Sequence, residues 1–268
     1  MSIRSTAAFV ILAAVAACRA GDGPDTESTI DKPAPAAESP EPASGLRTLL
    51  ASEGRPETDR ARDAGRRPAD VINFLGIDEG MHVIDIIAAG GYYTEVLSLT
   101  VGDDGRVVAH NPPIVLEMRD GANEKAISAR LAGNRLPNVT RLNKDFADFV
   151  PEDGPFDAAI TALNFHDLYN RRGPEATVAV FQAVASVLKP GAILGIIDHV
   201  GEAGEDNVAL HRIEISKVLE TIEAAGLVIE ADSDLLRNEA DDHSLSVFDA
   251  AVRGKTDRFL LRVSRPAD

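Results

Sequence analysis

The chain has 268 residues, 44% of them hydrophobic, which favours one full-sized globular domain with shorter appendages. Its formal net charge of −16 argues against a nucleic-acid partner, because each contact to a phosphate needs a local Lys or Arg. We therefore expect no binding to DNA or RNA.

Residues 1–18 have the features of an export signal. Arg4 precedes the apolar run AAFVILAAVAA, which is too short to cross a bilayer comfortably. The segment ends in VAAC, and Cys18 is the only cysteine of the chain, so no internal disulfide is possible. This ending resembles the lipobox of bacterial lipoproteins, in which the cysteine is lipidated; an ordinary signal peptide with an incidental cysteine is the alternative. With Arg19 after the cysteine, the resemblance implies an exported, periplasmic protein that contacts the membrane only through an N-terminal lipid anchor, in the outer membrane.

Residues 19–44 have the composition of a linker. They are rich in Pro, Ala, Ser and acidic residues and contain almost no large apolar side chain that a core could bury. We expect this segment to be disordered and residues 45–268 to form the folded domain.

Within that domain, strand-like and helix-like segments alternate. Pro68 stands at a helix start, and the patterns predict helices over 68–75, 92–101, 113–133, 174–188 and 212–226. Strands are predicted over 81–87, 105–111, 139–146, 156–164, 192–198, 227–236 and 257–266. The alternation predicts an α/β fold with a doubly wound, mostly parallel seven-stranded sheet. Since no helix separates the last two strands, the final strand is expected to be antiparallel.

The strand ends carry residues that resemble a known family. The acid Asp85 with the following glycine turn, and the segments GRVV, KDFADF, FDAAITALNFHD and LKPGAILGIIDH, together resemble the class I S-adenosylmethionine-dependent methyltransferases over about residues 67–266. The segment SDLLRNEADDHSLSVFDAAVRGKTDRFLLR resembles a bacterial subgroup of exported predicted methyltransferases. The resemblance implies S-adenosylmethionine as the cofactor, bound at the carboxyl edge of the sheet, and a small-molecule methyl acceptor.

The glycine turn departs from the pattern of that family. Its three glycine positions are occupied by Ile87, Ala89 and Gly91, with Gly90 between the last two. The added carbons occupy volume and restrict the backbone where glycine allows a close approach to the ligand. The resemblance nevertheless implies a cofactor site formed by Asp85, Ala89, Gly90, Gly91, Asn111, Asp145 and Asn164. In that site Asn111 replaces the usual acid that holds the ribose, and Asp145 with Phe146 flanks the adenine.

His166 and Asp167 are the predicted catalytic residues. They follow the fourth predicted strand, where the family places the side chains that face the methyl group, and an imidazole there can act as a general base. Alternatively, Asp167 caps the following segment and His166 lies on the surface.

Two further His and Asp groups suggest alternatives. Asp198 with His199, and Asp241 and Asp242 with His243, could join His166 around a metal ion in a hydrolase, since imidazole and carboxylate together bind zinc, iron or manganese. These groups could instead pair with one another and with Arg237 or Arg253 to fix the C-terminal loop. The preferred hypothesis is a methyltransferase without a metal. A catalytically degenerate binding protein at the cell envelope is the main alternative.

Overall fold

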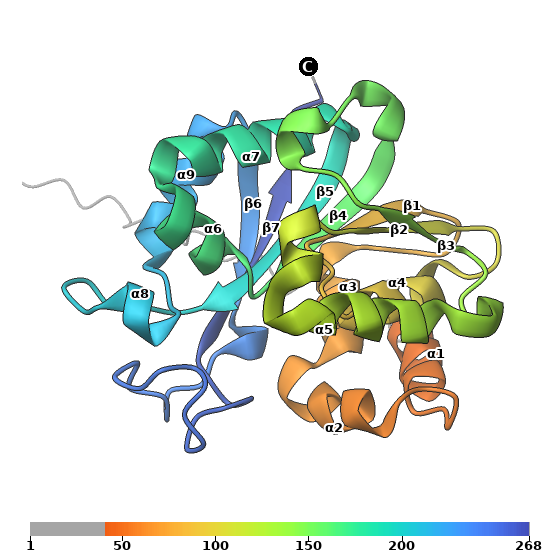
Figure 1. Ribbon diagram of the computed structural model, residues 1–268, viewed down its shortest axis with the longest axis horizontal. Helices are drawn as coiled ribbons and strands as arrows, with labels where there is room; N and C mark the ends of the chain where they lie inside the picture. Colours follow the sequence, from red (N-terminus) through yellow and green to blue (C-terminus); the bar gives the residue numbers. More distant parts are fainter. Residues whose placement is uncertain (1–40, 268) are drawn as a thin grey trace, which may run out of the picture. The chain divides into compact units, whose positions relative to one another are not determined.

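The computed structural model describes residues 41–267 of the chain (Figure 1). The predicted signal peptide, Cys18 and most of the predicted linker lie outside the described residues. Helix α1 begins at Glu41, so residues 41–44, which the sequence assigned to the linker, belong to a helix. None of the helices in the described part of the chain has the length and apolar content that crossing a bilayer requires.

Seven strands form one sheet in the order β3-β2-β1-β4-β5-β7-β6. Neighbouring strands are parallel except that β7 runs antiparallel to both β5 and β6. The predicted fold class is therefore confirmed. The strands are β1 (His82–Ile86), β2 (Arg106–His110), β3 (Val139–Leu142), β4 (Phe156–Ala162), β5 (Leu188–His199), β6 (Val228–Ser233) and β7 (Arg258–Ser264).

Helices cover both faces of the sheet, as Figure 1 shows. Side chains alternate along β1, so Val83 packs with α1, α3 and α4, whereas Ile84 packs with α7 and α9 on the other face. Helix α5 packs over Ala109 of β2 through Leu116 and Ile127. The helices are α1 (Glu41–Leu50), α2 (Glu57–Arg66), α3 (Pro68–Leu75), α4 (Tyr92–Val101), α5 (Pro113–Leu131), α6 (Phe165–Arg172), α7 (Pro174–Ser186), α8 (Asn207–Leu210) and α9 (Ile215–Ala224).

Three local predictions need correction. Helix α5 is not continuous, because the backbone leaves the helical conformation over Met118–Gly121, where three successive residues have positive φ. The third strand ends at Leu142 rather than at 146, and a short 3₁₀ turn follows at Phe146–Asp148. Helix α6 was not predicted; it has Asp167 in its first turn and basic residues in its last, as the helix dipole favours.

The strand order places a crevice at one position. From β1 the sheet continues to β2 on one side and to β4 on the other, so the connections leaving β1 and β4 turn away from each other. In doubly wound sheets, ligands bind beyond the carboxyl ends of the strands at this switch point. The fold therefore predicts a ligand site at the loops that follow Ile86 and Ala162.

Candidate functional site

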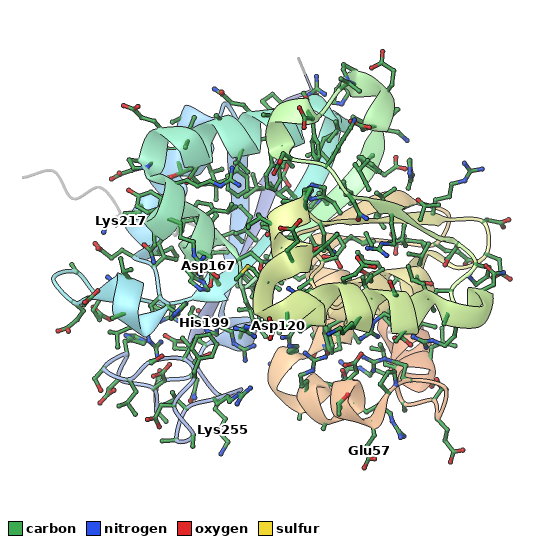
Figure 2. All side chains as sticks on the ribbon, in the orientation of Figure 1. Glu57, Asp120, Asp167, His199, Lys217 and Lys255 are labelled. Carbon is green, nitrogen blue, oxygen red and sulfur yellow. The ribbon has the colours of Figure 1, made fainter. Side chains whose placement is uncertain are left out.

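Two adjoining cavities lie at the switch point. One, of about 510 Å³, is polar and contains Asp85; the other, of about 450 Å³, contains His166 and has a mostly apolar lining. Asp167 on α6 and His199 at the end of β5, both labelled in Figure 2, line the apolar cavity. Residues from the loops after β1 and β4 and from the kinked part of α5 line both cavities: Ile87, Ala89, Arg119, Asn123, Leu163 and Asn164. The two cavities therefore adjoin along these loops.

A larger cavity does not mark the site. It measures about 800 Å³ and lies between α1, α3 and α4, far from the strand ends that face the crevice. Its lining contains neither a His nor a Lys or Arg. We therefore assign the candidate site by position and chemistry rather than by size.

Asp85 lies at the polar end of the site and is 3% exposed. Thr94, in the first turn of α4, donates a hydrogen bond of 2.7 Å from Oγ1 to Oδ2 of Asp85. Burial raises the pKa of Asp85 to about 7, despite this hydrogen bond and the nearby charges of Arg130 and Arg66. Among residues 41–267, no cation forms an ion pair with Asp85. The predicted role of Asp85 in the site is consistent with this placement. Thr94, for which no role was predicted, positions its carboxyl group.

Helix α2 supplies a cation to the cavity that contains Asp85. Arg66 is the last residue of α2 and lines the same cavity as Asp85. Its guanidinium carbon lies 4.3 Å from the ring centroid of Tyr92. No acid in the described part of the chain pairs with Arg66, and burial lowers the pKa of its guanidinium. The hydroxyl of Tyr92 donates a 2.6 Å hydrogen bond to Asp63, which ties α2 to α4. The sequence did not indicate Arg66, because the segment around it shows only a charged amphipathic pattern.

The loop after β1 keeps a glycine-like backbone conformation at two positions that are not glycine. Ile87 has φ 56° and Ala89 has φ 49°, a region that residues with a β-carbon seldom adopt. Asn111 holds the loop: its Oδ1 accepts a 2.8 Å bond from the N–H of Ala89, and its Nδ2 donates to the carbonyl oxygen of Ala89 at 3.3 Å. The Nδ2 of Asn164 donates to the carbonyl oxygen of Ile87 at 3.2 Å. A cavity of about 510 Å³ lies beside Asp85, with Ile87 and Ala89 in its lining.

Asn111 itself does not reach the cavity. It is 1% exposed, lines neither cavity, and uses its amide on the backbone of Ala89. The structure thus assigns it to bracing the loop, in place of the predicted contact with a ribose hydroxyl.

The two glycines of the loop differ in position. Gly90 lines the polar cavity, a position consistent with the predicted contact to a cofactor. Gly91 lines neither cavity, has φ 83°, and lies so close to α5 that an added β-carbon would approach Cδ1 of Ile127 to 2.5 Å. Its role is the close packing of helix α5 on the loop.

The region after β3 departs from the predicted adenine site. Asp145 is exposed and lines neither cavity. Phe146 is buried against the ring of His110, with 4.8 Å between the ring centroids. The Nε2 of His110 bonds to the carbonyl oxygen of Lys144 at 2.9 Å, and burial lowers the pKa of His110 to about 4, so this imidazole stays neutral. Neither Asp145 nor Phe146 reaches the cavities, because an aromatic cluster closes this part of the edge.

His166 lies in the apolar cavity, held from behind by Asp198. The Nδ1 of His166 is 2.8 Å from Oδ1 of Asp198, and the backbone N–H of His166 donates to Oδ2 of the same carboxylate at 2.8 Å. Because a carboxylate only accepts hydrogen bonds, Nδ1 carries the proton and Nε2 faces the cavity. Burial alone would lower the pKa of His166, but Asp198 outweighs it and raises that pKa. The prediction that His166 lies in the site is consistent with this geometry.

Asp167 is next to this imidazole and partly exposed. Its Oδ2 is 3.7 Å from Nε2 of His166, and its Oδ1 is 3.3 Å from Nε of Arg171 and 3.7 Å from Nδ1 of His211. No hydrogen bond to the helix N-terminus involves its carboxylate, so it does not cap α6. His211, at the end of α8, was missed by sequence analysis because no motif surrounds it.

The other His and Asp groups are divided between the site and the C-terminal loop. His199 lines the apolar cavity, and burial lowers its pKa to about 3. His243 is instead bonded to Asp257 at 3.0 Å, and Arg237 pairs with the same carboxylate at 2.9 Å. Asp241 forms a buried ion pair of 2.9 Å with Arg212. His243, Asp241 and Arg237 therefore take part in ion pairs of the C-terminal loop, as the alternative supposed, but their partners are Asp257 and Arg212, which the alternative did not name.

Comparisons with known proteins agree with this geometry. The family model of protein-L-isoaspartate (D-aspartate) O-methyltransferase matches residues 63–167, which include Arg66, Asp85 and His166. A search of curated protein sequences gives no match.

Solved structures share the fold at low sequence identity. A SAM-dependent methyltransferase from Aquifex aeolicus is 20% identical, with 83% of this chain and 97% of that chain covered and a TM-score of 0.55. The [4+2]-cyclase SpnF is 17% identical, with 85% and 93% covered and a TM-score of 0.58. A protein from Bacillus halodurans described as a methyltransferase is 17% identical, with 75% and 99% covered and a TM-score of 0.51. The chain therefore has the fold of the S-adenosylmethionine-dependent methyltransferases.

Proposed function

We propose that the chain is a methyltransferase that uses S-adenosylmethionine to methylate a small molecule. The observation that supports this most directly is the pair of opposite charges at the polar end of the site. Asp85 and Arg66 line one cavity, and neither has an ion-pair partner within residues 41–267. Asp85 is buried and Arg66 is half-buried, so a ligand that carries both an ammonium and a carboxylate group would stabilise the ionised form of Asp85 and the charge of Arg66 together.

The amino-acid end of S-adenosylmethionine has that charge pattern. Asp85 would bind the ammonium group, Arg66 the carboxylate, and the backbone near Gly90 would lie against the chain between them. The apolar cavity, with Val115, Met118 and Leu168 in its lining, suits the remainder of the cofactor and the acceptor. The residues present therefore fit the group.

When bound, this cofactor supplies a methyl group on a positively charged sulfur, and transfer depends mainly on alignment. At the acceptor end, Nε2 of His166 is placed to accept the proton that the acceptor loses. Asp198 then stabilises the resulting imidazolium through Nδ1–H, and it fixes the direction of the ring in both protonation states.

Binding of S-adenosylhomocysteine to the full chain tests the cofactor site. Ligand at a hundred times its Kd stabilises a protein by about 2.7 kcal/mol, which thermal unfolding detects as a rise in Tm. We expect this rise in the wild type and its near loss in Arg66→Gln. Arg106→Gln is the matched control, since Arg106 is exposed at the opposite edge of the sheet. Absence of any rise at millimolar ligand contradicts the proposal.

A binding protein that has lost its chemistry is the second candidate. The left-handed backbone at Ile87 and Ala89, and the export predicted from residues 1–18, which separates the chain from a cofactor made in the cytoplasm, both favour it. The [4+2]-cyclase with the same fold also shows that this fold hosts other activities. The same titration separates the candidates, because the second predicts no binding of S-adenosylhomocysteine.

A further inference from the structure

A cluster of three metal-ligating side chains lies at the acceptor end of the apolar cavity. His166 and Asp167 are on α6, and His211 follows α8. Each offers one ligand atom, and these atoms all lie within 4.8 Å of one another. From this cluster we propose a binding site for one divalent transition-metal ion of the zinc class. The proposal rests on the cluster alone and stands apart from cofactor binding.

The ligand atoms are close to the separation that a metal requires. A tetrahedral ion with bonds of about 2.0–2.2 Å holds its ligand atoms about 3.3–3.6 Å apart. Asp167 faces the two imidazoles with different oxygens: Oδ2 is 3.7 Å from Nε2 of His166, and Oδ1 is 3.7 Å from Nδ1 of His211, while one ligand atom from each residue lies within 4.8 Å of the others. The side chains of Asp167 and His211 are 41% and 31% exposed, so small rotations can bring both to the ion.

Asp198 completes the arrangement from behind. Its carboxylate accepts Nδ1–H of His166, which leaves the lone pair of Nε2 directed at the cluster. Metal-binding histidines commonly donate their second N–H to a carboxylate in this way, which fixes the tautomer and raises the basicity of the ligand. Asp198 and Asp167 together bring two negative charges to a doubly charged cation.

Two imidazoles with one carboxylate select the class of metal. Imidazole suits zinc, copper, iron and nickel, whereas calcium and magnesium prefer oxygen ligands alone. Three protein ligands leave coordination positions open, as in catalytic rather than structural zinc sites. Because His166 and Asp167 line the apolar cavity, those positions face the space assigned to the acceptor.

Metal binding would change how the acceptor is activated. With an ion on Nε2, His166 holds no lone pair for a proton, and the cation lowers the pKa of an acceptor group that binds it. The metal-free and metal-loaded chains would therefore activate the same acceptor by different means.

Titration of the chelator-treated full chain with Co²⁺ tests the proposal. We expect one equivalent to bind and to give the visible absorption of a four- or five-coordinate cobalt site, which one equivalent of Zn²⁺ abolishes. His211→Asn should lose this spectrum. Asparagine is the chosen replacement because His211 has φ 55°, and asparagine tolerates that conformation.

Two controls keep the outcome interpretable. His82→Gln changes a histidine at the start of β1, at the opposite edge of the sheet, and should bind cobalt as the wild type does. The unfolding midpoint of His211→Asn without metal shows that the variant is folded. Absence of a stoichiometric cobalt spectrum in the wild type, or an unchanged spectrum in His211→Asn, overturns the proposal. Neither result affects binding of S-adenosylhomocysteine, which depends on Asp85 and Arg66.

Discussion

Asp198 binds His166 twice, through the ring Nδ1 and through the backbone N–H, each at 2.8 Å. The carboxylate is fully buried, and Oδ1 also accepts the backbone N–H of His199 at 2.7 Å. One side chain at the end of β5 thus fixes both the start of α6 and the direction of the imidazole. The sequence suggested that Asp198 and His166 could meet at one site, but no pattern indicated that Asp198 binds the imidazole directly across 32 residues of chain.

Asp198→Asn should be strongly destabilising. It removes the charge from a buried pair and replaces one accepting oxygen by a donor, and breaking a buried pair costs about 3–5 kcal/mol. We expect a loss of that order in the free energy of unfolding, measured by urea denaturation. Asp167→Asn is the matched control: Asp167 is partly exposed and its pair with Arg171 contributes about 0–1 kcal/mol. Equal losses in the two variants would show that Asp198 has no special structural role.

Asp85 should make stability depend on pH. The pKa of Asp85 is about 7 in the folded chain and about 3.8 in the unfolded chain, so the folded state keeps the proton up to a higher pH. Stability from this group is present below pH 4 and falls as pH rises towards 7, by about 1.4 kcal/mol per pH unit.

Comparison with Asp85→Asn isolates this contribution, since the variant cannot titrate at position 85. The wild type should lose about 4 kcal/mol relative to Asp85→Asn between pH 4 and pH 8, measured by urea denaturation at each pH. A constant difference between the two proteins across that range would contradict the raised pKa of the buried Asp85.

Ala89→Gly should stabilise the chain. At φ 49° the β-carbon of Ala89 is disfavoured by about 1 kcal/mol, and its removal costs little burial. We expect a gain of about 0.5–1 kcal/mol, with binding of S-adenosylhomocysteine retained. The matched variant is Ala88→Gly. Ala88 does not have a positive φ and is buried, so we expect this variant to lose about 1 kcal/mol in its free energy of unfolding. Thermal unfolding of both variants measures the contrast, and a loss in Ala89→Gly would show that the conformation is not strained.

Gly91→Ala and Gly90→Ala should separate packing from ligand binding. At Gly91 the new methyl group would approach Ile127 to 2.5 Å at φ 83°, so we expect a loss of stability of about 2 kcal/mol. At Gly90 the nearest atom is Cβ of Ala126 at 3.1 Å, and the methyl group lies at the polar cavity. Gly90→Ala should therefore retain more stability but bind S-adenosylhomocysteine more weakly, as calorimetry can measure. The opposite order of stabilities would contradict these assignments.

The sequence predicted secondary structure best where Pro or Gly residues mark the ends of a segment with regular hydrophobic periodicity. Helices α3 and α4 were predicted with the bounds observed, because Pro68 begins the first and glycines bracket the second. The sheet class followed from the alternation of apolar strands with helical segments. The kink in α5 was missed because Arg119 and Asp120 are ordinary helix residues whose left-handed conformation no local pattern indicates.

The residues of the candidate site also fall into two groups: those that the sequence indicated and those that only the structure revealed. The sequence by itself determined which residues stand at the carboxyl ends of the strands, among them Asp85, Ala89 and His166, because strand ends can be located from periodicity. Only the tertiary structure decided that Asn111 braces a loop, that Arg66 lines the polar cavity and that His211 lies beside His166 and Asp167. The physical reason is that side-chain direction and long-range proximity depend on how helices pack across the sheet, which no local pattern records.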